Sequence, residues 1–431
     1  MALRVAGARV LARVALDGVS LRVALAPAQA QLADPRDRAL LAASLFAATR
    51  WWLRLDAALA RLIDQPLPAR AREVRALLVL GCAQLGVLAM PAYAVVAACV
   101  DASRALGFGQ MAGLVNAVLR RYLRERASLD AALDADAVTR HACPRWLIAA
   151  IEHDWPAQAA AILAAGNEEA PLTLRVNLRR CTRAQLLEQL AAAGIQASAP
   201  AHAPAALVLD RSTEVTRLPG YEQGWFSVQD AAAQAVAAAL QVRDGMRVLD
   251  ACAAPGGKAA HLLESAAPEL VALDRDADRL GRVRDNLARL GLCAQVIAGD
   301  AAQPAAWWDG RGFERILVDA PCSASGIIRR QPDIKLHRRG SAIAGLAAGQ
   351  QRILTALWPL LVPGGRLLYA TCSILRAENE AVLAAFLAAH DDARALALPD
   401  AYGHVAGAGR QRLPGEGGMD GFFYGLLEKH A

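Results

Sequence analysis

Two cysteines near the C-terminal end of the chain are the residues best suited to chemistry. Cys322 is the centre of a Pro-Cys-Ser triplet and Cys372 of a Thr-Cys-Ser triplet, and each triplet follows a predicted buried strand. A cysteine thiolate can add to carbon 6 of cytosine, which makes carbon 5 nucleophilic enough to attack an electrophilic methyl group. A base must then remove the carbon 5 proton so that the thiolate can leave. The pair therefore predicts covalent methyl transfer to a pyrimidine ring.

A glycine-rich turn joins the predicted strand Met246–Ala251 to the following helix. Its residues are Cys252, Ala253, Ala254, Pro255, Gly256, Gly257 and Lys258. The two glycines allow a tight turn and a close approach of the backbone to a ligand. The dinucleotide pattern GxGxxG is absent. A phosphate-binding P-loop would need glycine at position 252 and Ser or Thr at position 259, where cysteine and alanine stand.

Aspartates stand at the ends of three further predicted strands. Asp274 and Asp319 each end a strand, and Asp300 follows one. The carboxyl ends of strands in an open α/β sheet line the crevice where ligands bind, and an acid there can hydrogen-bond ribose hydroxyls. Each acid alone could instead cap a loop. Together with the glycine-rich turn, the three acids favour S-adenosyl-L-methionine over a phosphorylated cofactor.

The elements that must position these residues alternate between strand and helix from Gln229 onward, which predicts a mostly parallel, doubly wound, Rossmann-like sheet. The helix candidates are Ala277–Leu290 and Ile343–Leu361. The strand candidates are Met246–Ala251, Leu270–Asp274, Gln295–Ala298, Arg315–Asp319, Arg366–Thr371 and a last strand, Phe422–Leu427, expected to close the sheet.

The first 140 residues are predicted to be helical throughout, because apolar residues recur at three- and four-residue spacing. The expected helices are Ala39–Leu62, Ala71–Leu88, Tyr93–Leu106 and Met111–Arg126. A further helix, Trp146–Ala164, precedes a small α/β module with strands Leu172–Asn177 and Ala206–Asp210 and a helix capped by Thr182. The predicted domains are thus an all-α bundle (1–140), a linker helix with the module (141–228) and the sheet domain (229–431).

Composition limits the possible partners. The 431 residues carry a net charge of +6, and residues 1–140 hold 18 arginines against 11 acids, a net +7. This positive charge either faces phosphates of a nucleic acid or belongs to a solvated helical surface.

No uncharged apolar stretch of about 18 residues occurs, so we expect no membrane span. The eight cysteines include no CxxC pair, so we expect no metal site and a reducing, cytoplasmic location. The arginine-rich residues 1–20 suggest a first amphipathic helix rather than a transit peptide.

Several motifs together resemble the RNA cytosine-5 methyltransferases over residues 145–431. They are Cys252–Lys258, Val318–Ser323, Gly326, Pro332-Asp333, Ala370–Ser373, Glu378-Asn379 and Asp420–Tyr424. The helical front resembles the NusB-like domain that precedes the catalytic domain in a bacterial branch of that family, in which the substrate is 16S rRNA and the target is cytosine 967. The resemblance implies 16S rRNA as the substrate, either naked or in an early small-subunit assembly intermediate. We expect the protein to be a monomer.

The resemblance also implies roles for residues. Cys372 would be the nucleophile and Cys322 would assist release of the product. Asp319 would lie near the cytosine ring and the cofactor, and Lys258 would organise the site. The acids that would hold the adenosine moiety are Asp274 and Asp300.

Two points stay open at the level of the sequence. The family commonly has Gly-Thr before the glycine of its Pro-Cys-Ser loop, where this chain has Ala324-Ser325; the serine keeps the hydroxyl. DNA cytosine methyltransferases use the cysteine of a Pro-Cys loop, which here would make Cys322 the nucleophile. Two alternative functions remain. One is methylation of tRNA instead of rRNA, and the other is a non-catalytic RNA-binding role in which the sheet is only a scaffold.

Overall fold

The computed structural model describes residues 1–211 and 213–430, and these divide into two compact units. The helical unit comprises residues 1–168 and 328–340, and the sheet unit comprises residues 169–327 and 341–431. Residues 328–340, which follow the Pro-Cys-Ser loop directly in sequence, thus belong to the helical unit. The division of the chain at residues 140 and 228 stays a prediction.

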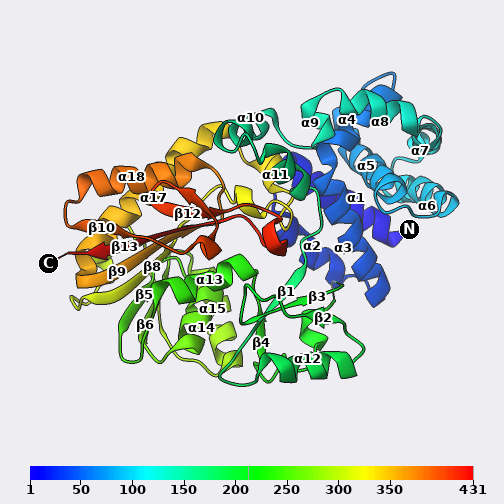
Figure 1. Ribbon diagram of the computed structural model, residues 1–431. Coiled ribbons are helices and arrows are strands. Elements are labelled where there is room, and N and C mark those ends of the chain that lie inside the picture. The colour runs from blue at the N-terminus through cyan, green and yellow to red at the C-terminus, as the bar shows by residue number, and fades with distance from the viewer. Residues whose placement is uncertain (212, 431) are drawn as a thin grey trace. The chain divides into compact units, whose positions relative to one another are not determined.

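The helical unit contains no strand among its described residues, as expected (Figure 1). Its core is α5, in which every residue from Ala76 to Leu85 is buried, because a helix that is apolar all round must be enclosed by others. The α-helices are α1 (Ala2–Asp17), α2 (Leu21–Ala30), α3 (Pro35–Arg50), α4 (Trp52–Leu62), α5 (Arg72–Gly86), α6 (Ala92–Ala105), α7 (Ala112–Arg124), α8 (Arg126–Asp134), α9 (Ala137–Arg140), α10 (Arg145–Asp154), α11 (Ala159–Ala165) and α16 (Ile334–His337).

Two of the expected helices are each interrupted. The expected helix Ala39–Leu62 is in fact two helices, α3 and α4, which meet at Trp51 with non-helical backbone angles (φ −103°, ψ 11°). The expected helix Trp146–Ala164 is likewise divided into α10 and α11. Pro156 explains this second break, because proline disfavours helical angles in the residue before it.

Residues 328–340 are built into the helical unit by polar contacts. The Lys335 ammonium donates to the Arg50 carbonyl (2.8 Å) and to the Asn167 side chain (2.7 Å). Asp333 accepts a hydrogen bond from the Leu21 backbone (3.3 Å). Burial lowers the pKa of Lys335 to about 7. A cation is buried only at a free-energy cost, so these contacts must hold the segment firmly in place.

The sheet unit begins with a small antiparallel sheet of strand order β2-β3-β1-β4, covered by α12 (Arg183–Ala192). Its strands are β1 (Leu172–Val176), β2 (Ala197–Ser198), β3 (Ala206–Leu209) and β4 (Phe226–Val228). Thr182 caps α12 as expected: it forms a reciprocal capping box with Gln185.

The main sheet has nine strands in the order β11-β12-β13-β9-β8-β5-β6-β7, with β10 also paired to β13. Its strands are β5 (Arg247–Asp250), β6 (Glu269–Asp274), β7 (Gln295–Ala298), β8 (Phe313–Asp319), β9 (Leu361–Thr371), β10 (Ala393–Leu396), β11 (His404–Ala406), β12 (Gly409–Arg412) and β13 (Phe422–Lys429). The pairs among β5, β6, β7, β8 and β9 are parallel, and the pairs made by β10 to β13 are antiparallel.

The parallel part of this sheet confirms the predicted Rossmann-like class. Helices lie on both of its faces, with α13 (Ala231–Leu240), α14 (Gly257–Ser265) and α15 (Ala277–Leu290) on one, and α17 (Ile343–Leu357) and α18 (Glu380–Ala389) on the other (Figure 1). Strand order reverses between β5 and β8, and a ligand crevice is expected at the carboxyl ends there. The last strand does not close the sheet, because β12 and β11 continue beyond it.

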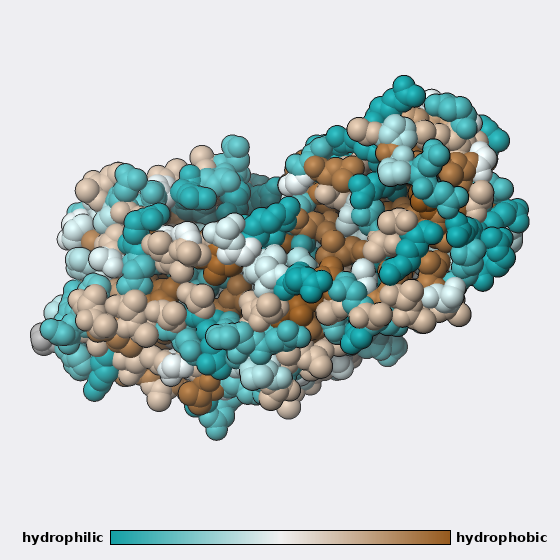
Figure 2. All heavy atoms as spheres, turned by 90° about the horizontal axis from the view of Figure 1, so that it is seen from above, coloured by the Kyte–Doolittle hydropathy of each residue, from teal (hydrophilic) through white to brown (hydrophobic). Residues whose placement is uncertain are grey.

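The surface of the molecule is mixed in character. In the view of Figure 2, hydrophilic side chains are spread among apolar ones instead of gathering in one place. Within residues 1–211 and 213–430, every helix is too short or too polar to cross a membrane.

Candidate functional site

The two cysteines meet because their strands are neighbours. Strands β8 and β9 pair in parallel with Asp319 opposite Ala370, so the triplets that follow them leave the sheet side by side. The sulfur atoms of Cys322 and Cys372 are 3.5 Å apart. Cys322 is buried, whereas Cys372 is partly exposed. The thiol that can be approached from solvent is therefore Cys372.

A buried carboxylate joins the two cysteine loops from behind. Glu378 accepts a hydrogen bond from the backbone of Ser323 (2.8 Å) in one loop and from the hydroxyl of Ser373 (2.7 Å) in the other. The Gln350 amide donates to Glu378 (3.2 Å) and to the Pro321 carbonyl (3.0 Å). Glu378 has no exposed surface, and hydrogen bonds to a buried charge are worth more than neutral ones. This carboxylate fixes the spacing of the two loops.

Ser325 adds a second connection between the loops. Its hydroxyl lies 3.1 Å from that of Ser373 and accepts a hydrogen bond from the backbone of Ile374 (3.0 Å). These contacts need the hydroxyl group itself. They explain why a serine can stand where the resembling family commonly has a threonine.

Gly326 lets the backbones of three segments touch. Its N–H donates to the Cys372 carbonyl (2.8 Å), and its carbonyl accepts from the Gly421 N–H (2.9 Å). A Cβ atom at position 326 would lie 2.4 Å from the Gly421 oxygen and 2.8 Å from the Cys372 oxygen. Any side chain here would push the Cys372 loop out of position.

Lys258 and Asp319 form an ion pair beside the thiols. The Lys258 ammonium donates to the Asp319 carboxylate at 2.6 Å. Burial alone would lower the pKa of Lys258, but Asp319 outweighs it and, with a further contribution from Cys372, raises that pKa above its ordinary value. Lys258 therefore stays charged at neutral pH.

The hydrogen bond with Cys372, followed by burial, raises the pKa of the Cys322 thiol well above its ordinary value. Cys322 therefore keeps its proton at neutral pH. The two thiols are chemically distinct in the resting protein, although both triplets look alike in the sequence.

The glycine-rich turn has the conformation that its residues suggest. Gly256 has a φ of +96°, which favours glycine, and a Cβ there would crowd Val283 at 3.1 Å. The Asp274 carboxylate accepts hydrogen bonds from the backbones of Ala254 (3.0 Å) and Asp276 (3.0 Å). Asp274 therefore supports the turn. Each carboxylate oxygen has a second lone pair that remains available to a ribose hydroxyl.

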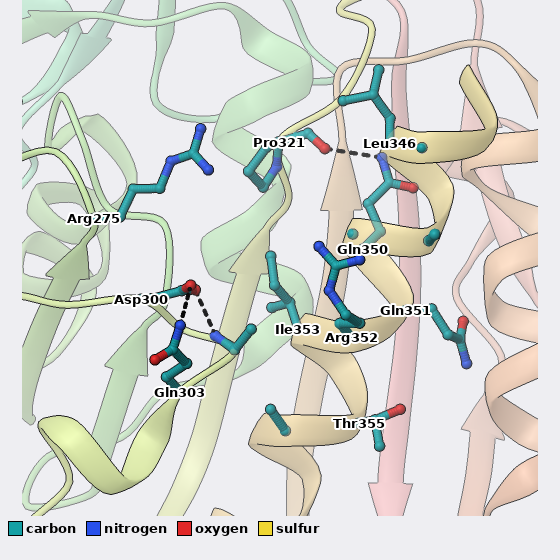
Figure 3. Close-up of a pocket in the computed structure, with 15 residues that line it drawn as sticks. Arg275, Asp300, Gln303, Pro321, Leu346, Gln350, Gln351, Arg352, Ile353 and Thr355 are labelled. Carbon is teal, nitrogen blue, oxygen red and sulfur yellow. Dashed lines mark hydrogen bonds between the residues drawn. The ribbon is translucent and has the colours of Figure 1, made fainter. Parts of the chain in front are cut away.

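A cavity of about 880 Å³ opens between the carboxyl ends of the sheet and α17 (Figure 3). Asp300 and Gln303 form one wall, Arg275 and Pro321 lie between, and Gln350 belongs to the α17 wall. Asp300 accepts hydrogen bonds from the Ala302 backbone (2.9 Å) and the Gln303 amide (3.3 Å). The cavity borders the Cys322 loop and is large enough for a nucleoside-sized ligand.

The structure therefore brings together the residues selected from the sequence in two neighbouring groups. Cys322, Cys372, Lys258 and Asp319 form the reactive group, and Asp300 lines the adjoining cavity. The sequence alone assigns no role to Glu378, although Glu378-Asn379 is one of the motifs that carry the family resemblance.

Asp250 was also missed. It ends β5, is fully buried, and its pKa is raised to about 7 by burial first and then by Asp319. Its place at the end of a strand, like that of Asp274 and Asp319, was the available signal.

Comparisons with known proteins cover the whole chain. Residues 237–428 match the family "16S rRNA methyltransferase RsmB/F", residues 143–216 match the ferredoxin-like domain of the same proteins, and residues 1–124 match the NusB family. The chain is 50% identical to ribosomal RNA small subunit methyltransferase B of Xylella fastidiosa strain Temecula1, over 99% of this chain and 97% of that protein. It is 48% identical to the protein of that name from Pseudomonas putida, over 99% and 98%.

A solved structure shares the fold over about two thirds of the chain. The methyltransferase homolog protein from Pyrococcus horikoshii superposes with a TM-score of 0.58 at 27% identity, covering 68% of this chain and 97% of that one. The geometry, the matched families and the relatives agree on one class of protein.

Proposed function

Because the chain belongs to the RsmB/F family of 16S rRNA methyltransferases, which use S-adenosyl-L-methionine, we propose that it methylates carbon 5 of a cytosine in 16S rRNA, at position 967. The observation that supports this specificity most is the pair of thiols 3.5 Å apart beside Lys258 and Asp319. Transfer to an exocyclic nitrogen needs no thiolate, and so would leave this pair without a task.

The first half of the reaction needs a thiolate. Cys372, the partly exposed thiol of the pair, is proposed to supply it. The thiolate forms a bond from sulfur to carbon 6, and the electron pair of the carbon 5–carbon 6 double bond moves toward N3. Asp319 and the Lys258 ammonium paired with it are proposed to face that edge of the ring, where the ammonium can offset the negative charge that develops at N3. Carbon 5 is then nucleophilic.

When bound, S-adenosyl-L-methionine supplies an electrophilic methyl group on a sulfonium. The residues proposed to hold it are those of the glycine-rich turn, with Asp274 and Asp300 for the adenosine moiety. Asp300 lines the 880 Å³ cavity, which reaches Pro321 beside Cys322, and Asp274 supports the turn through the Ala254 backbone. The carboxylate chemistry of these acids fits the hydroxyl groups of a ribose.

The second half is elimination, and Cys322 is proposed to serve it. The hydrogen bond with Cys372 is the largest cause of the raised pKa of Cys322. Once the Cys372 sulfur is bonded to carbon 6, it carries no negative charge, and this cause disappears. Cys322, after releasing its own proton to solvent, takes the proton from carbon 5. The electron pair of that bond re-forms the carbon 5–carbon 6 double bond as the bond from sulfur to carbon 6 breaks, and Cys372 leaves as a thiolate.

The substrate would be held partly by the helical unit, which carries the positive charge of the chain. Arg9 and Arg13 lie on the exposed face of α1, one turn apart. Such residues neutralise phosphates without reading the base sequence.

The test is methyl transfer from labelled cofactor to 16S rRNA, followed by mapping of the modified base. We expect 5-methylcytosine at a single position with the wild type and none with Cys372→Ala. Label on a nitrogen of the base, or efficient labelling of tRNA instead, would contradict the proposal.

A further inference from the structure

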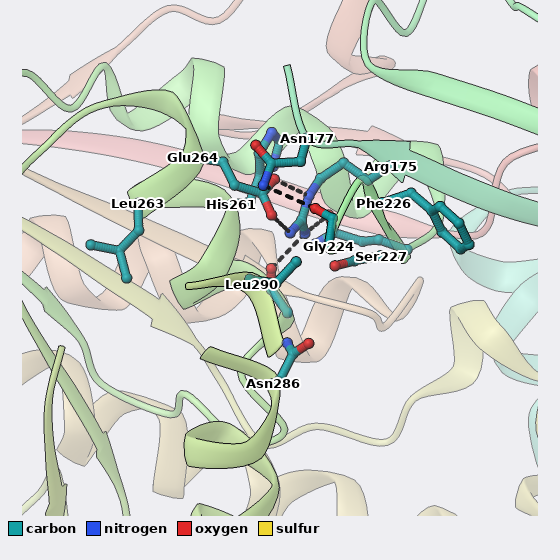
Figure 4. Close-up of polar contacts among 12 residues, drawn as sticks. Arg175, Asn177, Gly224, Phe226, Ser227, His261, Leu263, Glu264, Asn286 and Leu290 are labelled. Atoms are coloured by element: carbon teal, nitrogen blue, oxygen red, sulfur yellow. Dashed lines mark hydrogen bonds and ion pairs between the residues drawn. The ribbon is translucent and has the colours of Figure 1, made fainter. Parts of the chain in front are cut away.

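Arg175, in β1 of the small antiparallel sheet, is fully buried although it carries a charge. Its guanidinium forms a two-fold ion pair with Glu264 at the end of α14, with N–O distances of 2.8 and 2.7 Å. The Nη1 atom donates to the Gln229 side chain and to the Gly257 carbonyl, each at 2.6 Å. Figure 4 shows Arg175 next to Glu264, with His261 nearby.

The contact with Gly257 connects the small sheet to the glycine-rich turn. Gly257 is the first residue of α14 and directly precedes Lys258, whose ammonium is paired with Asp319. One buried group from a different part of the unit therefore fixes the backbone at the point where the turn becomes a helix.

Two ionisable groups next to Arg175 are His261, which is neutral, and Glu264, which carries the opposite charge. His261, one turn along α14 from Gly257, is partly buried, and burial together with Arg175 lowers its pKa well below the ordinary value. His261 is therefore neutral at pH 7. The positive charge of Arg175 is balanced by Glu264, and its rigid fork can be shared among three acceptors.

Stability alone does not require this arrangement. A buried ion pair often contributes no more than well-packed apolar residues of the same volume, because removing two charges from water is costly. What an apolar pair cannot do is hold the Gly257 carbonyl. We propose that Arg175 is a positioning residue for the cofactor turn, through which the small sheet fixes the backbone of Gly257 and Lys258. This inference rests on the proposed cofactor site.

The chain offers matched controls in the same loop region. Arg179 donates to the Leu263 carbonyl (2.8 Å) at the far end of α14, and Arg180 donates to the Leu290 carbonyl (2.8 Å) at the end of α15. Arg179 thus attaches the loop after β1 to the same helix, α14, and Arg180 attaches it to α15. The hydrogen bonds of both arginines lie away from the glycine-rich turn.

The experiment compares Arg175→Lys, Arg175→Met, Glu264→Gln and the control Arg179→Met in the full-length protein. Calorimetry with S-adenosylhomocysteine gives cofactor affinity, a gel-shift assay gives rRNA affinity, and thermal melting gives stability. We expect Arg175→Lys and Arg175→Met to weaken cofactor binding about tenfold or more, with rRNA affinity unchanged. Arg179→Met should lower the melting temperature but keep cofactor affinity within about twofold.

Two results would overturn the role of Arg175: equal losses of affinity with Arg175→Met and Arg179→Met, or full affinity with Arg175→Lys. If Arg175→Met does not fold, the comparison of Arg175→Lys and Glu264→Gln with Arg179→Met still decides the matter. Asp274→Ala is measured alongside. Undiminished affinity in that variant would remove the proposed cofactor site itself, whereas a loss there with none at Arg175 would remove the positioning role only.

Discussion

Asp250 should make the cofactor-free protein less stable as the pH rises, and Asp250→Asn should remove that effect. The carboxyl is fully buried at the end of β5, and burial and Asp319 raise its pKa from 3.8 to about 7. Because the native state binds this proton more tightly than the unfolded state does, the free energy of unfolding falls as the pH rises between the two pKa values.

The size of the effect follows from the shift. Each pKa unit corresponds to about 1.36 kcal/mol, so a rise of roughly three units costs the native state up to about 4 kcal/mol above pH 7. Between pH 5 and pH 8, the part of the transition that is accessible amounts to about 3 kcal/mol. Asparagine is of similar size and uncharged, so the variant should lose this dependence and be the more stable protein at pH 8.

The assay is urea unfolding of cofactor-free wild type, Asp250→Asn and the control Asp285→Asn, an exposed aspartate on α15, at pH 5, 6, 7 and 8. The difference in unfolding free energy between Asp250→Asn and wild type should grow with pH. The control should follow the wild type. A difference that is constant with pH, or one that shrinks, would refute the reasoning about Asp250.

Three other predictions concern the site and the substrate. Glu378→Gln should slow methyl transfer about 10- to 100-fold in single turnover, because hydrogen bonds to a charged group contribute about 1.5–3 kcal/mol. Calorimetry should show unchanged cofactor affinity for this variant. A loss of cofactor binding would contradict the assignment of Glu378 to the cysteine loops. Asp274→Ala should weaken cofactor binding but not rRNA binding, and calorimetry with no change would reduce Asp274 to a support of the turn. The double substitution Arg9→Gln, Arg13→Gln should lower the slope of log affinity for rRNA against log salt by about one per lost phosphate contact, whereas Arg394→Gln in the sheet unit should not. Substitution is preferable to deletion of the helical region, which would also strip residues 328–340 of their partners.

Much of the reactive group could be predicted because it depends on local patterns. Strands that end in Asp274 and Asp319 have short apolar runs, and parallel order then brings their carboxyl ends to one edge. Two kinds of feature were not predicted: breaks within helices, and contacts between residues that are far apart in the sequence. Apolar spacing continues through Trp51, so the sequence contains no sign of the break between α3 and α4. The break between α10 and α11, by contrast, is marked in the sequence by Pro156.

Contacts between residues far apart in the sequence lay beyond prediction. Glu378 reaches Ser323, 55 positions earlier, and Arg175 reaches Glu264, 89 positions later. Residues 328–340 join the helical unit although they follow the Pro-Cys-Ser loop directly. A buried polar network of this kind depends on which loops meet, and this is fixed only when the whole sheet has formed.

The most direct test of the proposed mechanism separates the two cysteines by trapping. Wild type, Cys372→Ala and Cys322→Ala are incubated with 16S rRNA and cofactor and then run on a denaturing gel. The proposed mechanism predicts that Cys322→Ala accumulates a covalent protein–RNA adduct, because elimination is blocked after addition, and that Cys372→Ala forms no adduct and transfers no methyl group. An adduct that accumulates with Cys372→Ala and is absent with Cys322→Ala would reverse the two roles. Full activity in both variants would contradict the thiolate mechanism.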